Sequence, residues 1–202
     1  QFADGYLRIV QLLSFVIFPV MLGFVAIAAD MFMLLLGEKW MPTVPYFEIL
    51  ALSGLFYPLS VVSYNVLKSR SDGKVIVRLE VIKRIIMTAV LCYTIPRGVE
   101  SVAWGMTAMA FVDFVINTAA ALSYLSLSSF RLLASIIPQL LLAAVMFVCL
   151  YLFEPYIASL SLGLRLLVEI TVGIVIYAAG ALICRLQALH ELIQLLRGYM
   201  AK

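Results

Sequence analysis

The chain has 202 residues, of which 65% are hydrophobic and 12% are charged, and its formal net charge is +3. A soluble globular domain is about half apolar and about a quarter charged, so this composition excludes an ordinary soluble protein. The small net charge gives no support to nucleic-acid binding, and the few basic residues serve better as indicators of membrane topology.

Long apolar stretches, separated by Pro, Gly, Ser and charged residues, predict membrane-spanning helices. A span needs about 20 apolar residues, so the chain has room for about six. The stretches are too continuous for the alternating strands of a membrane barrel. The sequence therefore predicts an all-α integral membrane protein with a single domain over residues 1–202. The six helices are expected near residues 9–29, 44–67, 76–95, 102–124, 133–153 and 163–184.

Two prolines predict kinks in the first two helices, and the C-terminal tail predicts a further helix. Pro19 lies inside the first predicted helix and Pro58 inside the second, and a proline in a helix interior removes a hydrogen bond and causes a kink. Residues 185–202 place leucine and isoleucine on one helical face and charged residues on another. They predict an amphipathic helix on the membrane surface, or else a charged continuation of the sixth helix.

The distribution of Lys and Arg predicts the orientation, because basic connections stay in the cytoplasm. The connection 68–78 contains four basic residues and the tail 185–202 contains three, whereas the connections 37–43 and 96–101 contain one each. Both ends of the chain are therefore expected to face the cytoplasm. Because the chain begins with Gln1 and shows no signal peptide, we also expect it to be part of a longer protein.

Motifs of common enzymes and nucleotide-driven transporters are absent from the sequence. It has no P-loop, HExxH or GxSxG motif, and its single histidine, His190, lies in the tail. Cys92, Cys149 and Cys184 stand singly within or next to apolar stretches, which gives no support to a metal site or a disulfide. We therefore expect a protein that is not an enzyme and that needs no cofactor.

Residues 36–74 carry motifs that resemble one family of membrane proteins. The segment resembles the polysaccharide flippases, which include O-antigen and exopolysaccharide exporters, within the multidrug, oligosaccharidyl-lipid and polysaccharide exporter superfamily. Ser69 departs from this pattern, since members often have Gly there. The matching segments are Leu36-Gly37-Glu38-Lys39-Trp40, Pro42, Val44-Pro45, Ile49-Leu50-Ala51-Leu52, Pro58-Leu59 and Arg70-Ser71-Asp72, with Phe18-Pro19 before them.

The resemblance implies the C-terminal lobe of a flippase with the fold of the multidrug exporters, in which two lobes of six helices are related by pseudo-symmetry. Such a protein moves lipid-linked oligosaccharide, carried on a polyprenyl pyrophosphate, across the bacterial inner membrane for lipopolysaccharide or exopolysaccharide synthesis. The implied partners are this substrate, membrane lipids and the N-terminal lobe of the same protein. Two alternatives stay open, a cation-coupled multidrug exporter of the same superfamily and a membrane-embedded glycan polymerase or transferase.

Ionisable residues inside the predicted helices are candidates for charge pairs or for a substrate path, because an ionised side chain costs about 2.5–3.5 kcal/mol at mid-membrane. Arg84 and Asp113 lie equally far from the connection between the third and fourth helices, which places them at equal depth. We predict that Asp113 pairs with Arg84, or with Lys83 as a substitute, although Glu80 can compete for Arg84 along its own helix. For Glu169 we favour helix packing and a charge partner over a substrate or proton role. The full set of candidates is Glu80, Lys83, Arg84, Asp113, Asn117 and Glu169.

Overall fold

The computed structural model describes residues 2–186, 188, 189, 191 and 192, and every regular element among them is helical. This confirms the predicted all-α fold. The long helices are α1 (Phe2–Ala26), α5 (Gly73–Thr94), α6 (Val99–Leu125), α7 (Ser129–Ile157) and α8 (Leu162–Ile183). The shorter elements are α2 (Ala28–Leu35), α3 (Val44–Ser53), α4 (Tyr57–Arg70) and the 3₁₀ helices η1 (Glu38–Thr43) and η2 (Ile95–Arg97).

Five helical segments of the described residues are long and apolar enough to cross a membrane, where we had predicted about six. The exception is α5, because it carries Arg78, Glu80, Lys83 and Arg84 close together. Its 22 residues equal the length of α8, and at about 1.5 Å per residue they extend about 33 Å. α5 therefore has the length of a span but not the composition of one. The five segments are Phe2–Ala26, Glu38–Arg70, Val99–Leu125, Ser129–Ile157 and Leu162–Ile183.

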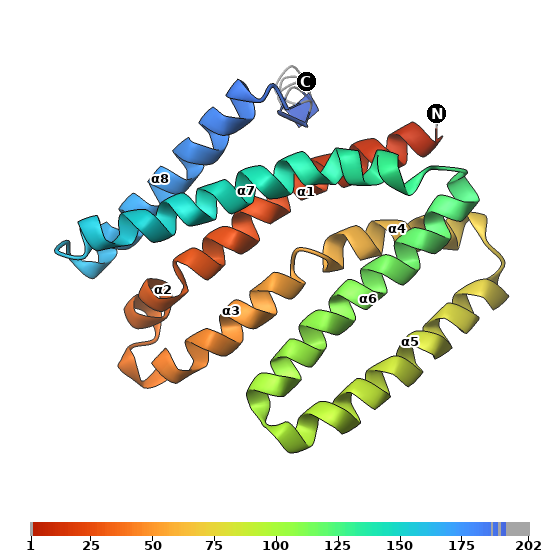
Figure 1. The fold of residues 1–202 in the computed structure, drawn as a ribbon, viewed down its shortest axis with the longest axis horizontal. Coiled ribbons are helices and arrows are strands. Elements are labelled where there is room, and N and C mark those ends of the chain that lie inside the picture. The colour runs from red at the N-terminus through yellow and green to blue at the C-terminus, as the bar shows by residue number, and fades with distance from the viewer. Residues whose placement is uncertain (1, 187, 190, 193–202) are drawn as a thin grey trace, which may run out of the picture.

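The helices form two adjoining groups (Figure 1). In one group α7 packs along α1, and α8 lies against α7; in the other α6 packs along α3 and α4, and α5 lies against α6. α1 also contacts α3 and α4, so it joins the two groups. α5 and α8 are consequently the outermost helices of the bundle, one at each side of the view.

The second predicted helix is broken close to its internal proline. α3 ends at Ser53, and the backbone N–H groups of Gly54, Leu55 and Phe56 bond three residues back before α4 begins at Tyr57. Pro58 has no N–H, so the carbonyl of Gly54 has no helical donor four residues on. The kink expected at Pro58 is therefore a change of helix direction just before it, visible between α3 and α4 in Figure 1.

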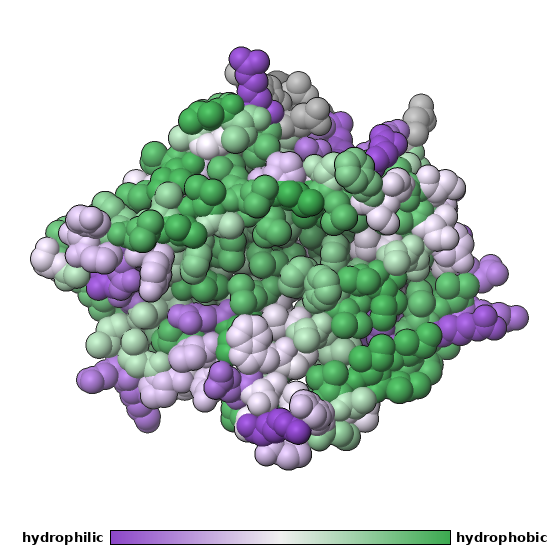
Figure 2. All heavy atoms as spheres, viewed as in Figure 1, coloured by the Kyte–Doolittle hydropathy of each residue, from purple (hydrophilic) through white to green (hydrophobic). Residues whose placement is uncertain are grey.

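Apolar side chains cover the outside of the bundle as well as its centre. Figure 2 shows them across the middle of the visible face, while hydrophilic residues gather mostly toward the ends of the helices. Phe130, Leu141 and Ile174 are more than half exposed. A surface of this kind is stable when lipid replaces water around it, which agrees with an integral membrane protein.

Most of the predicted amphipathic tail, 185–202, lies outside the described residues. In its described part Leu186 and Ala188 are buried in the main apolar cluster. Glu191 forms an ion pair with Arg8 of α1, with 2.9 Å between Oε2 and Nε. These residues connect the chain after α8 to the first turns of α1.

Candidate functional site

Lys83 lies at the centre of a polar chain that links α5, α6 and α4. Its buried ammonium forms an ion pair with Glu80, one turn earlier on α5, and donates to Oδ1 of Asn117 on α6 at 3.3 Å. Asn117 in turn donates from Nδ2 to the hydroxyl of Ser60 on α4 at 2.9 Å. The ring of Tyr64 lies 5.4 Å from Nζ of Lys83 and adds a cation–π contact. A buried cation needs such compensation, and here three helices provide it.

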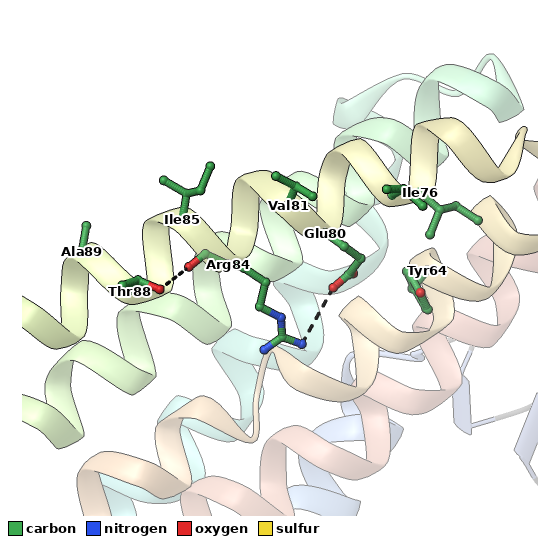
Figure 3. A pocket seen from close by; sticks show the side chains of 9 residues that line it. Tyr64, Ile76, Glu80, Val81, Arg84, Ile85, Thr88 and Ala89 are labelled. Atoms are coloured by element: carbon green, nitrogen blue, oxygen red, sulfur yellow. Dashed lines mark hydrogen bonds and ion pairs between the residues drawn. The ribbon is translucent and has the colours of Figure 1, made fainter.

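The predicted ion pair between Arg84 and Asp113 is wrong. Arg84 has 80% of its side chain exposed, and its Nη2 lies 3.9 Å from Oε2 of Glu80 (Figure 3). Asp113 forms no ion pair among the described residues, and its Oδ1 is buried without a hydrogen-bond partner. Adjacent residues of a helix point about 100° apart, and the rotation of α5 turns Lys83 inward and Arg84 outward. Glu80, three and four residues before them, contacts both.

Two hollows lie on either side of this charged group, and Glu80 and Arg84 border both. The smaller one, about 250 Å³, is also lined by Lys83 and Asp113, so Arg84 and Asp113 border the same hollow. The larger one, about 790 Å³, runs along α5 and is lined mainly by aliphatic side chains, with Tyr64 of α4 at one end (Figure 3). Charge and apolar surface therefore adjoin along one helix.

A second polar chain crosses the bundle nearby. The hydroxyl of Tyr6 on α1 lies 2.8 Å from that of Ser63 on α4, and Ser63 lies 3.0 Å from the hydroxyl of Thr118 on α6. All three residues are buried. Satisfied polar groups of this kind hold membrane helices together where the hydrophobic effect cannot.

Glu169 lies far from this group, in a second charged cluster where α2, α7 and α8 meet. Arg165 of α8 forms ion pairs with Asp30 of α2 (Nε to Oδ2, 2.5 Å) and Glu154 of α7 (Nη2 to Oε1, 2.9 Å). Oε1 of Glu169 lies 3.6 Å from the same Nε, which confirms a charge partner for Glu169. Burial raises the pKa of the Asp30 carboxyl above its ordinary value; Arg165 opposes this shift and Glu154 adds to it.

Five of the six candidate residues lie close together, and the sixth, Glu169, has partners that we did not name from the sequence. Glu80, Lys83, Arg84, Asp113 and Asn117 all lie where α5 faces α6 or borders it. Asp30 and Arg165 look like ordinary residues at helix ends, although each interrupts an apolar stretch, and that interruption is the signal that could have marked them. Among the described residues, no group of three or more His, Cys, Asp or Glu is arranged to hold a metal ion.

Comparisons with known proteins agree on one class of protein. Residues 1–45 match a family model described as "Polysaccharide biosynthesis protein". The chain is 27% identical over 114 residues to an "Uncharacterized membrane protein in cps region" of Klebsiella pneumoniae, an alignment covering 56% of this chain and 24% of the relative. It is 32% identical over 71 residues to the "Teichuronic acid biosynthesis protein TuaB" of Bacillus subtilis, covering 34% of this chain and 15% of that protein.

The chain thus spans only about a quarter, or less, of the length of the curated relatives that it matches. No solved structure matches it. The matched residues include α1, α2 and η1, the part of the chain in which the Leu36-Gly37-Glu38-Lys39-Trp40 motif lies. With its apolar helices, the chain is similar to membrane proteins of polysaccharide biosynthesis over the parts that match.

Proposed function

We propose that this chain is the C-terminal part of a transporter that flips or exports lipid-linked oligosaccharide precursors across the bacterial inner membrane. The observation that carries the proposal is the position of Arg84, an exposed cation between a small hollow that Lys83 and Asp113 also line and a long apolar groove along α5. The similarity to polysaccharide biosynthesis proteins supports the class of substrate. Transport and not catalysis is proposed because the sequence carries no motif of a reactive site.

The two hollows suit the two chemically different parts of such a substrate. A lipid-linked glycan joins an isoprenoid chain to a sugar through phosphate, and a guanidinium binds phosphate oxygens with paired hydrogen bonds. Arg84 is only weakly held by Glu80, at 3.9 Å, so its donors are accessible to an anion. The aliphatic groove along α5 provides a surface for the isoprenoid chain. The small hollow, about 250 Å³, lies below the range of about 300–1,000 Å³ typical of sites that enclose a ligand. It would therefore hold the phosphate and leave the sugars outside.

The test compares Arg84→Ala with Arg78→Ala in the full-length protein, expressed in a polysaccharide-producing bacterium that lacks its own copy. Arg78 is an exposed arginine of the same helix that lines neither hollow, so it is the matched control. We expect Arg84→Ala to lower surface polysaccharide and to leave lipid-linked oligosaccharide on the cytoplasmic face, and Arg78→Ala to behave like the unchanged protein. Accessibility of the glycan to a lectin in right-side-out and inverted vesicles measures the face, and immunoblots of membranes measure protein level.

The same experiment separates the alternatives. Loss of a glycan polymerase would leave unpolymerised lipid-linked glycan on the periplasmic face. Loss of a multidrug exporter would leave the glycan unchanged and increase drug accumulation. Either result in cells that lack the protein would contradict the proposed function.

A further inference from the structure

Three carboxylates surround a single cation where α2, α7 and α8 meet. Arg165 is, among the described residues, the only cation that pairs with Asp30, Glu154 or Glu169. Its guanidinium carries one positive charge, whereas three ionised carboxylates carry three negative charges. The cluster therefore contains more acid than its cation can neutralise.

The three carboxylates differ in their distance from Arg165 and in their exposure to solvent. Asp30 lies closest, with Oδ2 at 2.5 Å from Nε of Arg165, an ion pair that lacks the geometry of a hydrogen bond. Glu154 accepts a hydrogen bond from Nη2 at 2.9 Å and is half exposed, so solvent also stabilises its charge. Glu169 has only 6% of its side chain exposed, and its Oε1 lies 3.6 Å from the nitrogen that Asp30 already contacts. Its other oxygen, Oε2, is buried and has no hydrogen-bond partner in the described part of the chain.

The helices around Glu169 offer it no second cation. The part of α1 that follows Arg8 contains no ionisable residue. The last turns of α7 add Cys149, Tyr151 and Tyr156 to Glu154, none of which is a cation. α2 presents only Asp30, and α8 itself carries Arg165, Glu169 and Tyr177. An ionised carboxylate that is buried without a partner is strongly unfavourable, whereas a neutral carboxyl in the same place is much less so.

We propose that Glu169 is a proton-binding site, whose carboxyl holds a proton while Asp30 occupies Arg165. When Asp30 leaves the guanidinium, the Glu169 O–H bond breaks, the proton passes to water, and the carboxylate takes the place of Asp30 at Nε. With Asp30 in place and Glu169 protonated, the cluster has a net charge of one negative unit. With Asp30 moved away on α2 and Glu169 ionised, the residues that remain have the same net charge. The proton on Glu169 is thus linked to the docking of α2 on α8, and this inference stands independently of the substrate that the protein transports.

The experiment measures protonated carboxyl groups in the full-length protein in lipid by infrared spectroscopy, through the carbonyl stretch that only a protonated carboxyl shows. Spectra are taken across a pH titration for the unchanged protein and for Glu169→Gln, Asp30→Asn and Glu154→Gln. We expect the unchanged protein to show this band at neutral pH and Glu169→Gln to lose one component of it. Asp113, whose Oδ1 is also buried without a hydrogen-bond partner among the described residues, accounts for a component that stays the same in every variant. Asp30→Asn should also lose the Glu169 component, because Arg165 becomes free to pair with an ionised Glu169.

Glu154→Gln is the matched control, since it removes a carboxylate from the same cluster but leaves Asp30 on Arg165; it should keep the band. A band of the same intensity in Glu169→Gln and in the unchanged protein would show that Glu169 holds no proton, and would overturn the proposal. If Glu169→Gln does not fold, Asp30→Asn decides the question, because a band unchanged in that variant would contradict the exchange at Arg165.

Discussion

Nζ of Lys83 lies 3.3 Å from the side-chain oxygen of Asn117, so α5 is joined to α6 through a neutral amide and not through the carboxylate of Asp113. Asn117 both accepts from Lys83 and donates to Ser60, and it is buried. One side chain therefore satisfies polar groups on two neighbouring helices. Its removal should cost more than the loss of a single hydrogen bond.

The first prediction concerns this amide. Asn117→Leu keeps the side-chain size but leaves Lys83 and Ser60 without their partner, so we expect the free energy of unfolding to fall by about 1–3 kcal/mol. Asn65→Leu, at an exposed position of α4, is the control and should change stability by less than about 0.5 kcal/mol. Thermal or denaturant unfolding of the full-length protein in detergent measures both. Equal losses would mean that the Asn117 bridge contributes nothing of its own.

The second prediction concerns the pair that the structure does not form. A double-mutant cycle on Arg84→Ala and Asp113→Ala should give a coupling energy within about 0.5 kcal/mol of zero, because the two side chains share no ion pair and Arg84 is exposed. The same cycle on Glu80→Gln and Lys83→Met should give a larger coupling, since that pair is in contact and partly buried. A coupling at Arg84 and Asp113 that matches the one at Glu80 and Lys83 would be incompatible with this geometry.

The third prediction concerns the contact between α7 and α8. A Cβ atom on Gly180 would overlap the Leu142 side chain, whereas one on Gly163 would meet nothing within 4 Å. Gly180→Val should therefore lower the free energy of unfolding by about 1–3 kcal/mol through overpacking, and Gly163→Val should not show this steric loss. Adding Leu142→Ala to Gly180→Val should recover part of the loss by making room. Failure of this second change to restore any stability would exclude a direct clash as the cause.

The fourth prediction concerns orientation, which follows from the basic residues of the connection after α4. A cysteine at Asp72 should react with a membrane-impermeant thiol reagent only after intact cells are opened, and a cysteine at Glu100 should react from outside. Both positions are exposed. Cys92, Cys149 and Cys184 must first be replaced, because two of them are exposed and would add their own signal. Labelling of the Asp72 position from outside would reverse the predicted topology.

The helices themselves could be predicted from sequence because hydrocarbon leaves the backbone little choice. A segment of about 20 apolar residues must satisfy its own N–H and C=O groups, and a helix does so locally. The break before Pro58 was predictable for the same local reason, the missing N–H. α5 is different. Its length predicts a helix, but its charged residues prevent a prediction of how deep it lies in the membrane, because that depth depends on the helices that pack against it.

The sequence predicts which charged residues of neighbouring helices lie level with one another, but not the direction in which each side chain points. Counting residues from the connection placed Arg84 level with Asp113, and both do line one hollow. Whether Lys83 or Arg84 faces α6 depends on the rotation of α5 about its axis, which is decided by how its whole surface packs.

By itself, the sequence determined which segments are helices, that these helices suit a membrane, and which residues carry charge into it, because each of these depends on neighbours along the chain. The tertiary structure alone decided that Lys83 meets Asn117, that Asp113 has no ion pair among the described residues, and that Asp30 reaches Arg165. Those contacts join helices distant in sequence. Their partners are selected by packing and rotation, which depend on all the helices at once.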